Sequence, residues 1–161
     1  MIKQEEITNW VGRVKSREIA MSTTSITPAV TPGRALRIGL WVAQGLVFLV
    51  FSFAGLTKLL TPIPQLAAMM PWAGEYSPTV VHLIALIDLA GGVGILLPAL
   101  TRIMPGLTVP AALGCVALQI VAMAFHLSRG EASVVPLNIV LLALAAFVLW
   151  GRATKAPILP R

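Results

Sequence analysis

The amino-acid sequence predicts an all-α fold, an integral membrane four-helix bundle. Of its 161 residues, 57% are hydrophobic and only 11% are charged, and the mean hydropathy is +0.88. An average soluble domain is about half apolar and about one quarter charged. Four long apolar segments follow one another, and the sequence lacks the alternating strands of about ten residues that build a membrane barrel. These observations exclude an ordinary soluble protein.

Residues 1–37 precede the first apolar segment and are polar. They contain six Lys and Arg residues and end in a Ser/Thr/Pro stretch from Ser22 to Pro32. Because this segment has no apolar periodicity, we expect a disordered cytoplasmic N-terminal tail. Met21 is a second candidate start of the chain, and the segment Met1 to Ala20 is expected to be dispensable or a gene-start artefact.

The membrane-spanning helices are expected at residues 38–60, 79–100, 106–127 and 134–150. At about 1.5 Å per residue, the first three are long enough to cross about 30 Å of hydrocarbon, and the fourth is at the short end of the usual range. Small residues within the segments allow helix backbones to approach closely in lipid. The four-helix domain thus covers residues 38–152, and residues 153–161 form a cytoplasmic C-terminal tail.

A proline-rich loop connects the first two spans. Residues 61–78 contain four prolines, which permit only a short helical turn between them. Met69, Met70 and Trp72 in this loop suit the interface between membrane and water. We therefore expect a lid that lies at the membrane surface.

The distribution of basic residues predicts the orientation in the membrane. Ten Lys and Arg residues lie on the side of the two termini, and only Lys58 and Arg129 lie on the other side. Positive residues are enriched in cytoplasmic loops. The sequence therefore predicts a multi-pass protein of the bacterial inner (plasma) membrane, with both termini cytoplasmic and Glu75 and Glu131 outside.

Four polar residues fall at similar outer depths on four different spans: Lys58, Asp88, His126 and Asn138. Such side chains are costly in hydrocarbon unless they are paired or hydrated. Their helical spacing relative to small residues places them on faces suited to helix contacts. They are the candidate ligand-binding or structural polar cluster, and they are expected to converge inside the bundle.

Each member of this cluster also has a purely structural interpretation. Lys58 can extend its amine to the interface, His126 can mark a helix boundary, and Asp88 can pair with Lys58 without any ligand. Gln44, Gln119 and Asn138 are more often interhelical hydrogen-bonding groups than ligands, and the single Cys115 is more often a packing residue.

The composition also argues against several kinds of site. One cysteine excludes an internal dithiol, and the scattered His, Asp and Glu residues match no metal-ligand spacing. The basic residues form no aromatic-interleaved patch for nucleic acid. No catalytic residue is assigned, no covalent cofactor or metal is expected, and the lipid bilayer is the predicted surrounding.

Five stretches of the chain together resemble the DoxX-like family of small bacterial membrane proteins. They are FSFAGLTKL (51–59), AMMPWAGE (68–75), LIDLAGGVGILLPALTR (86–102), AFHLSRGE (124–131) and PLNIVLLALAAFVLWGR (136–152). The resemblance implies a four-helix membrane protein. It also implies a link to redox systems, because some relatives are subunits of quinone-linked oxidases and others are associated with redox-protein maturation. Many relatives have Glu in the second helix, where this chain has the shorter Asp88.

Three functions stay open at this point. The favoured one is a non-enzymatic accessory or small apolar-ligand-binding subunit of a membrane redox system, with a redox protein as partner. The second is a quinone-interacting subunit of an oxidoreductase, in which Asp88 and His126 exchange protons with the quinone. The third is a small-molecule or lipid transporter. The sequence does not specify the ligand or the oligomeric state.

Overall fold

The computed structural model describes residues 4–5, 8–13 and 32–161, and the chain divides into two units, Met1–Thr31 and Pro32–Arg161. In the first unit, residues 4–5 and 8–13 are helical, and the Thr8 hydroxyl donates a hydrogen bond to the carbonyl of Gln4. The rest of the predicted disordered tail up to residue 31, and with it the candidate start at Met21, lies outside the described residues. The second unit carries the membrane domain.

Four long helices form this domain: α2 (Arg34–Leu60), α4 (Pro78–Thr101), α5 (Thr108–Ser128) and α6 (Val135–Trp150). The short elements between and after them are α3 (Ile63–Met69), η1 (Pro71–Gly74), η2 (Pro105–Leu107), η3 (Ala132–Val134) and η4 (Gly151–Lys155). Within the residues that the structure describes, four helices are long and apolar enough to cross a membrane, with α5 and α6 extended by the short helices beside them. The predicted all-α membrane fold is confirmed, and the described residues contain no strand.

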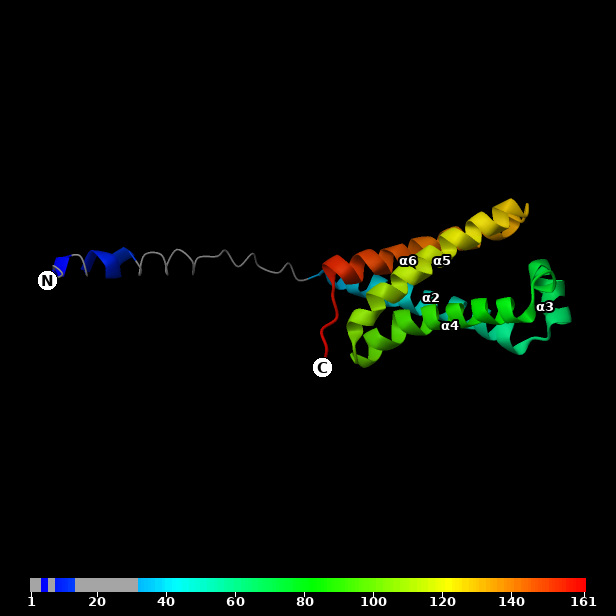
Figure 1. Cartoon of the computed structure of the whole chain (residues 1–161), viewed down its shortest axis with the longest axis horizontal. Coiled ribbons are helices and arrows are strands. Elements are labelled where there is room, and N and C mark those ends of the chain that lie inside the picture. The colour runs from blue at the N-terminus through cyan, green and yellow to red at the C-terminus, as the bar shows by residue number, and fades with distance from the viewer. Residues whose placement is uncertain (1–3, 6–7, 14–31) are drawn as a thin grey trace. The chain divides into compact units, whose positions relative to one another are not determined.

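The fourth span is longer than the sequence indicated. η3 precedes α6 and η4 continues it without interruption, so the helical stretch runs from Ala132 to Lys155, 24 residues. The first residues of the predicted C-terminal tail therefore belong to the helix. Both this end of the chain and the start of α2 lie at the same end of the bundle (Figure 1).

The four helices pack in a closed ring. α2 contacts α4 and α6, and α5 contacts the same two helices from the other side. Figure 1 shows that the α5–α6 pair diverges from the α2–α4 pair toward the end of the bundle where α3 lies. We call this the α3 end, and we call the end with the α4–α5 turn and the C-terminus the opposite end.

The core explains why the opposite end is closed. Its buried apolar residues come from all four helices and include Val47, Ile95, Ala112, Leu141 and Val148. Phe51 and Leu141 also line the α3-end half and Val47 is at the middle of α2, whereas Ile95, Ala112, Cys115 and Val148 lie toward the opposite end. Apolar packing in that half therefore holds the helices together, and the bundle can contain a cavity with polar side chains at the α3 end.

A buried arginine also closes the opposite end. Arg152 is 5% exposed, and its Nε donates a hydrogen bond of 2.8 Å to Oε1 of Gln44, which accepts a second bond from the same guanidinium. The Gln44 amide in turn donates to the carbonyl of Ile95, and the guanidinium lies over the Trp41 ring. Gln44 is therefore an interhelical hydrogen-bonding residue, as its position in a span suggested.

The proline-rich loop forms more structure than a single turn. α3 makes nearly two helical turns from Ile63 to Met69, with Pro64 in its first turn, where the missing N–H group leaves no intrahelical bond unmade. Met69 is exposed, as expected of an interfacial residue, but Trp72 is buried against Leu66 and Val81. The ring of Trp72 therefore packs into the α3 end and is not exposed at the surface.

Candidate functional site

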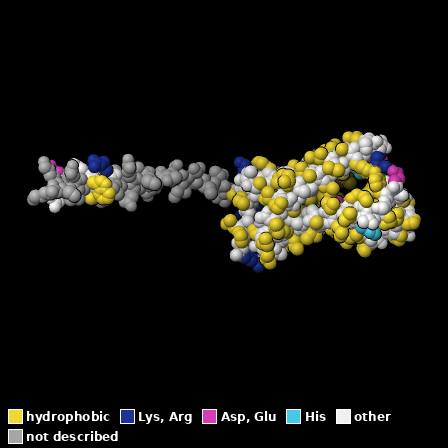
Figure 2. All heavy atoms as spheres, in the orientation of Figure 1, with side chains coloured by type: hydrophobic (Ala, Val, Ile, Leu, Met, Phe, Trp, Pro, Cys, Tyr) yellow, Lys and Arg dark blue, Asp and Glu magenta, His cyan; other side chains and the backbone are white. Residues whose placement is uncertain are grey.

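A cavity of about 480 Å³ occupies the α3 end of the bundle. Its 18 lining residues come from η1, the loop that follows η1, and all four long helices, and each helix contributes from the half nearest the α3 end. Figure 2 shows the surface hollowed between the two helix pairs at this end, beside a group of basic and acidic side chains. The cavity exists because the α5–α6 pair diverges here while a lid of α3 and η1 covers the end.

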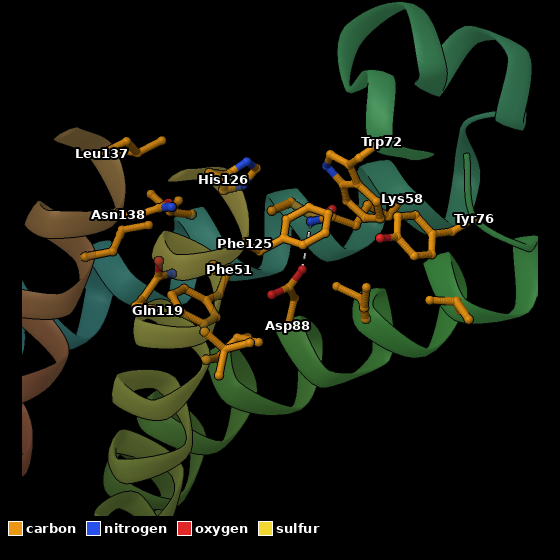
Figure 3. A pocket seen from close by; sticks show the side chains of 18 residues that line it. Phe51, Lys58, Trp72, Tyr76, Asp88, Gln119, Phe125, His126, Leu137 and Asn138 are labelled. Atoms are coloured by element: carbon orange, nitrogen blue, oxygen red, sulfur yellow. Dashed lines mark hydrogen bonds and ion pairs between the residues drawn. The ribbon is translucent and has the colours of Figure 1, made fainter. Parts of the chain in front are cut away.

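All four residues of the predicted polar cluster line this cavity. Lys58 comes from α2, Asp88 from α4, His126 from α5 and Asn138 from α6. Their side chains surround the cavity from different sides (Figure 3). They do not form one hydrogen-bonded network, because only Lys58 and Asp88 bond to each other.

Lys58 and Asp88 form a buried ion pair. The Lys58 Nζ lies 2.8 Å from Oδ2 of Asp88, and the two side chains are 10% and 11% exposed. Nζ also lies 3.5 Å from the carbonyl of Ala54, one turn earlier in α2. Small residues one turn away from each partner, Gly55 and Gly92, let α2 and α4 approach closely enough for this contact. The pair neutralises both charges within the cavity wall.

His126 bonds away from the ion pair. Its Nδ1 lies 2.7 Å from Oε2 of Glu131, which is on the connection between α5 and η3. The histidine ring itself lines the cavity. The contact therefore joins a side chain of the cavity wall to a carboxylate near the surface.

Two amides of the wall have buried atoms without a hydrogen-bond partner. Within the described part of the chain, Oε1 of Gln119 and Nδ2 of Asn138 both lack one, and Gln119 as a whole is 7% exposed. In Figure 3 both side chains lie on the α5–α6 side of the cavity, across from the Lys58–Asp88 pair. An unpartnered buried amide is unfavourable. Among the described residues of the wall, Gln119 therefore offers an acceptor and Asn138 a donor.

Three aromatic rings stand between the lid and α5. Trp72 lies edge-on to Phe125 with ring centroids 6.0 Å apart, and Tyr76 lies at the same distance from Phe125. These arrangements suit the quadrupoles of aromatic rings. All three residues also line the cavity, so the lid closes on α5 through aromatic contacts.

A series of ion pairs also joins the segment before α4 to the segment after α5. Arg129, after α5, forms two hydrogen bonds of 2.7 Å with the carboxylate of Glu75, before α4. Its Nε forms a third, of 2.8 Å, with Glu131. We call Glu75, Arg129 and Glu131 the rim bridge, because it links the η1–α4 connection to the α5–η3 connection beside the cavity.

The rim bridge shifts the titration of its members. Hydrogen bonding by Arg129 lowers the pKa of Glu75. Hydrogen bonding by His126, and then by Arg129, lowers the pKa of Glu131. The hydrogen bonds that Arg129 donates to Glu75 and then to Glu131 raise the pKa of Arg129. All three groups are therefore held in their charged forms.

Several of these residues were not predicted as site residues from the sequence. Glu75, Arg129 and Glu131 were not included in the predicted polar cluster, and Trp72 was expected at the interface. Gln119 was identified as polar but was expected to make an interhelical hydrogen bond. An Arg within two residues of a Glu after a span, together with a Glu in the preceding outer loop, is the signal that could have indicated the rim bridge.

The described residues hold no group of three or more His, Cys, Asp and Glu side chains able to bind a metal ion. A family model described as the DoxX-like family matches residues 42–148, which include the lid and most of the four long helices. No curated protein and no solved structure matches the chain.

Proposed function

The chain belongs to the DoxX-like family, and from this premise and the cavity geometry we propose that it binds a small, mainly apolar molecule within its helical bundle. In this proposal the protein is a non-enzymatic accessory subunit of a membrane redox system, with a redox protein as its partner. The redox link rests on the family resemblance. The binding role rests on one observation, a cavity of about 480 Å³ with mainly apolar walls and few polar groups.

Size and lining support binding of a small molecule. Ligand cavities are commonly about 300–1,000 Å³ and combine apolar walls with a few polar groups that orient the ligand. Here Val50, Phe51, Ile84 and Leu141 are among the apolar wall residues. The lining residues on the four long helices all come from the α3-end half of those helices, which favours a closed binding site over a pathway through the bundle.

We propose further that the protein is in the bacterial inner membrane, with both termini cytoplasmic and the α3 end outside. The excess of ten to two in Lys and Arg supports this orientation. The hollow between the helix pairs lies on the side of the bundle (Figure 2), where a spanning protein faces lipid. A molecule dissolved in the membrane could then enter from the outer leaflet.

Comparison of copurified molecules tests the binding role. Ala122 lines the cavity, whereas Ala124 is exposed and does not line it. Ala122→Phe is expected to fill the cavity, and Ala124→Phe is the matched control. Organic extracts of the purified proteins, compared by mass spectrometry, should contain a small molecule in near-equal amounts with wild type and Ala124→Phe and much less with Ala122→Phe. Identical extracts from all three proteins would contradict the proposal.

A second candidate function is a quinone-interacting subunit of an oxidoreductase. The observation that favours it is the contact of His126 with Glu131, because it joins a cavity residue to the rim by one hydrogen bond of 2.7 Å. Asp88 and His126 would exchange protons with the bound quinone. Membranes with His126→Phe should then oxidise quinol more slowly than membranes with wild type, and an unchanged rate would contradict this function.

A further inference from the structure

Unpartnered hydrogen-bonding atoms in the cavity wall indicate which hydrogen-bonding groups a ligand should carry. Oε1 of Gln119 can accept a hydrogen bond and Nδ2 of Asn138 can donate one, and neither atom has a partner in the part of the chain that the structure describes. Both atoms are buried, and both residues line the cavity from the α5–α6 side (Figure 3). A ligand that supplies one donor and one acceptor would satisfy both.

The ionisable side chains of the cavity wall already have partners. Lys58 and Asp88 are paired with each other at 2.8 Å, and His126 contacts Glu131 at 2.7 Å. A charged ligand would therefore enter an apolar cavity without a free counter-ion, which is strongly unfavourable. The site favours a neutral molecule.

We infer that the cavity takes a neutral, mainly apolar molecule that carries a hydroxyl group, with the hydroxyl directed at Gln119 and Asn138. A hydroxyl is the smallest group that both donates and accepts a hydrogen bond. It donates to Oε1 of Gln119 and accepts from Nδ2 of Asn138, while the apolar body contacts residues such as Phe51, Leu118 and Phe125. This inference rests on the proposed binding function and names the class of its ligand.

Three related probes separate the two hydrogen bonds. 4-Butylphenol can donate and accept, 4-butylanisole can only accept, and butylbenzene can do neither. Their affinities are measured by calorimetric titration of the full chain in lipid nanodiscs, with titrations of empty nanodiscs subtracted. Wild type should bind the phenol about tenfold more tightly than the anisole, because a hydrogen bond to a buried acceptor is gained, and it should bind butylbenzene least.

Variants assign each bond to its residue. Gln119→Met should reduce the affinity for 4-butylphenol to that for 4-butylanisole and leave the latter unchanged. Asn138→Leu should weaken the binding of both oxygen-containing probes and leave butylbenzene binding unchanged. Gln65 is exposed and does not line the cavity, so Gln65→Met is the matched control and should bind all three probes as wild type does.

The outcomes distinguish this inference from the proposed function. Equal binding of the three probes to wild type, with loss of all three in Ala122→Phe, would overturn the hydroxyl preference and keep the binding function. A phenol preference that persists in Gln119→Met would also overturn the inference. Wild type that binds none of the probes would contradict both.

Discussion

At the scale of single residues, the cavity contains two charges that depend on each other. Lys58 and Asp88 have side chains that are 10% and 11% exposed, and each would be an unpaired buried charge without the other. Breaking a buried pair is strongly destabilising, whereas replacing both partners with neutral groups often costs little. The pair therefore stabilises the contact between α2 and α4 only while both residues are present.

A double-mutant cycle measures this dependence. Asp88→Asn and Lys58→Met should each lower stability by about 3–5 kcal/mol, because each leaves the partner charged or unpaired in the cavity wall. The double variant should lose less than the sum of the two. Thermal unfolding in detergent gives the three values. Additive losses would show that the two side chains do not stabilise each other.

The rim bridge predicts a loss of stability in acid. Because the folded pKa values of Glu75 and Glu131 are lowered, their stabilisation is present above the ordinary value of 4.5 and is lost as the pH falls through the folded values. The melting temperature of wild type should therefore drop from pH 5 downward. Arg129→Met removes a cause of both shifts, so its melting temperature should depend less on pH in this range. Parallel pH profiles for the two proteins would contradict a stabilising role of the bridge.

At the scale of helices, the ion pair depends on how closely α2 and α4 approach. A Cβ atom on Gly55 would lie 2.8 Å from the carbonyl oxygen of Ala85, and one on Gly92 would lie 2.9 Å from the Ser52 hydroxyl. The first contact involves the backbone of α4, which cannot rotate away as a side chain can. The two helices are therefore in contact along a seam of small residues.

Gly55→Ala should force α2 and α4 apart. We expect a destabilisation of about 1–3 kcal/mol from overpacking, together with weaker binding of 4-butylphenol, because the cavity wall moves. Gly45, in the same helix, has no atom within 4 Å of an added Cβ, so Gly45→Ala is the matched control. The control should be neutral or slightly stabilising, since Ala favours helix more than Gly. Equal thermal stability of the two variants would contradict the close-contact argument.

At the scale of the whole molecule, the two ends of the bundle have different interiors. Apolar side chains from all four helices, with Arg152 on Gln44, close the opposite end. At the α3 end the helix pairs diverge (Figure 1), and the aromatic rings and the rim bridge join them across the cavity. The bundle is therefore closed at one end and contains a cavity with polar side chains at the other, near one face of the membrane.

The orientation of the helical bundle in the membrane is tested with reporter fusions. The ten-to-two distribution of Lys and Arg predicts that a fusion after Arg152 is active only in the cytoplasm, and one within residues 61–78 only outside. Alkaline phosphatase and green fluorescent protein at both positions provide the opposite signals. Reversed signals at the two positions would contradict the predicted orientation and put the cavity near the cytoplasmic face.

The all-α membrane class, the approximate spans and the family could all be predicted from the amino-acid sequence. Long apolar segments and a shortage of charge act locally, because each span must satisfy its own backbone hydrogen bonds in lipid. The depths of Lys58, Asp88, His126 and Asn138 could also be read from position along each helix. Depth along a helix does not determine which side chains are in contact.

The hydrogen-bond partners within the site follow from the packing of the helices and could not be predicted from the sequence. His126 bonds to Glu131 and not to Asp88, and the Trp72 ring is buried within the protein. Oε1 of Gln119, for which an interhelical bond was expected, has no partner among the residues that the structure describes. These outcomes depend on how helices rotate and diverge, which is set by packing between residues far apart in sequence, such as Gly55 against Ala85. Apolar periodicity specifies which face of a helix is buried, but the shape of the space between helices follows from all four packing at once.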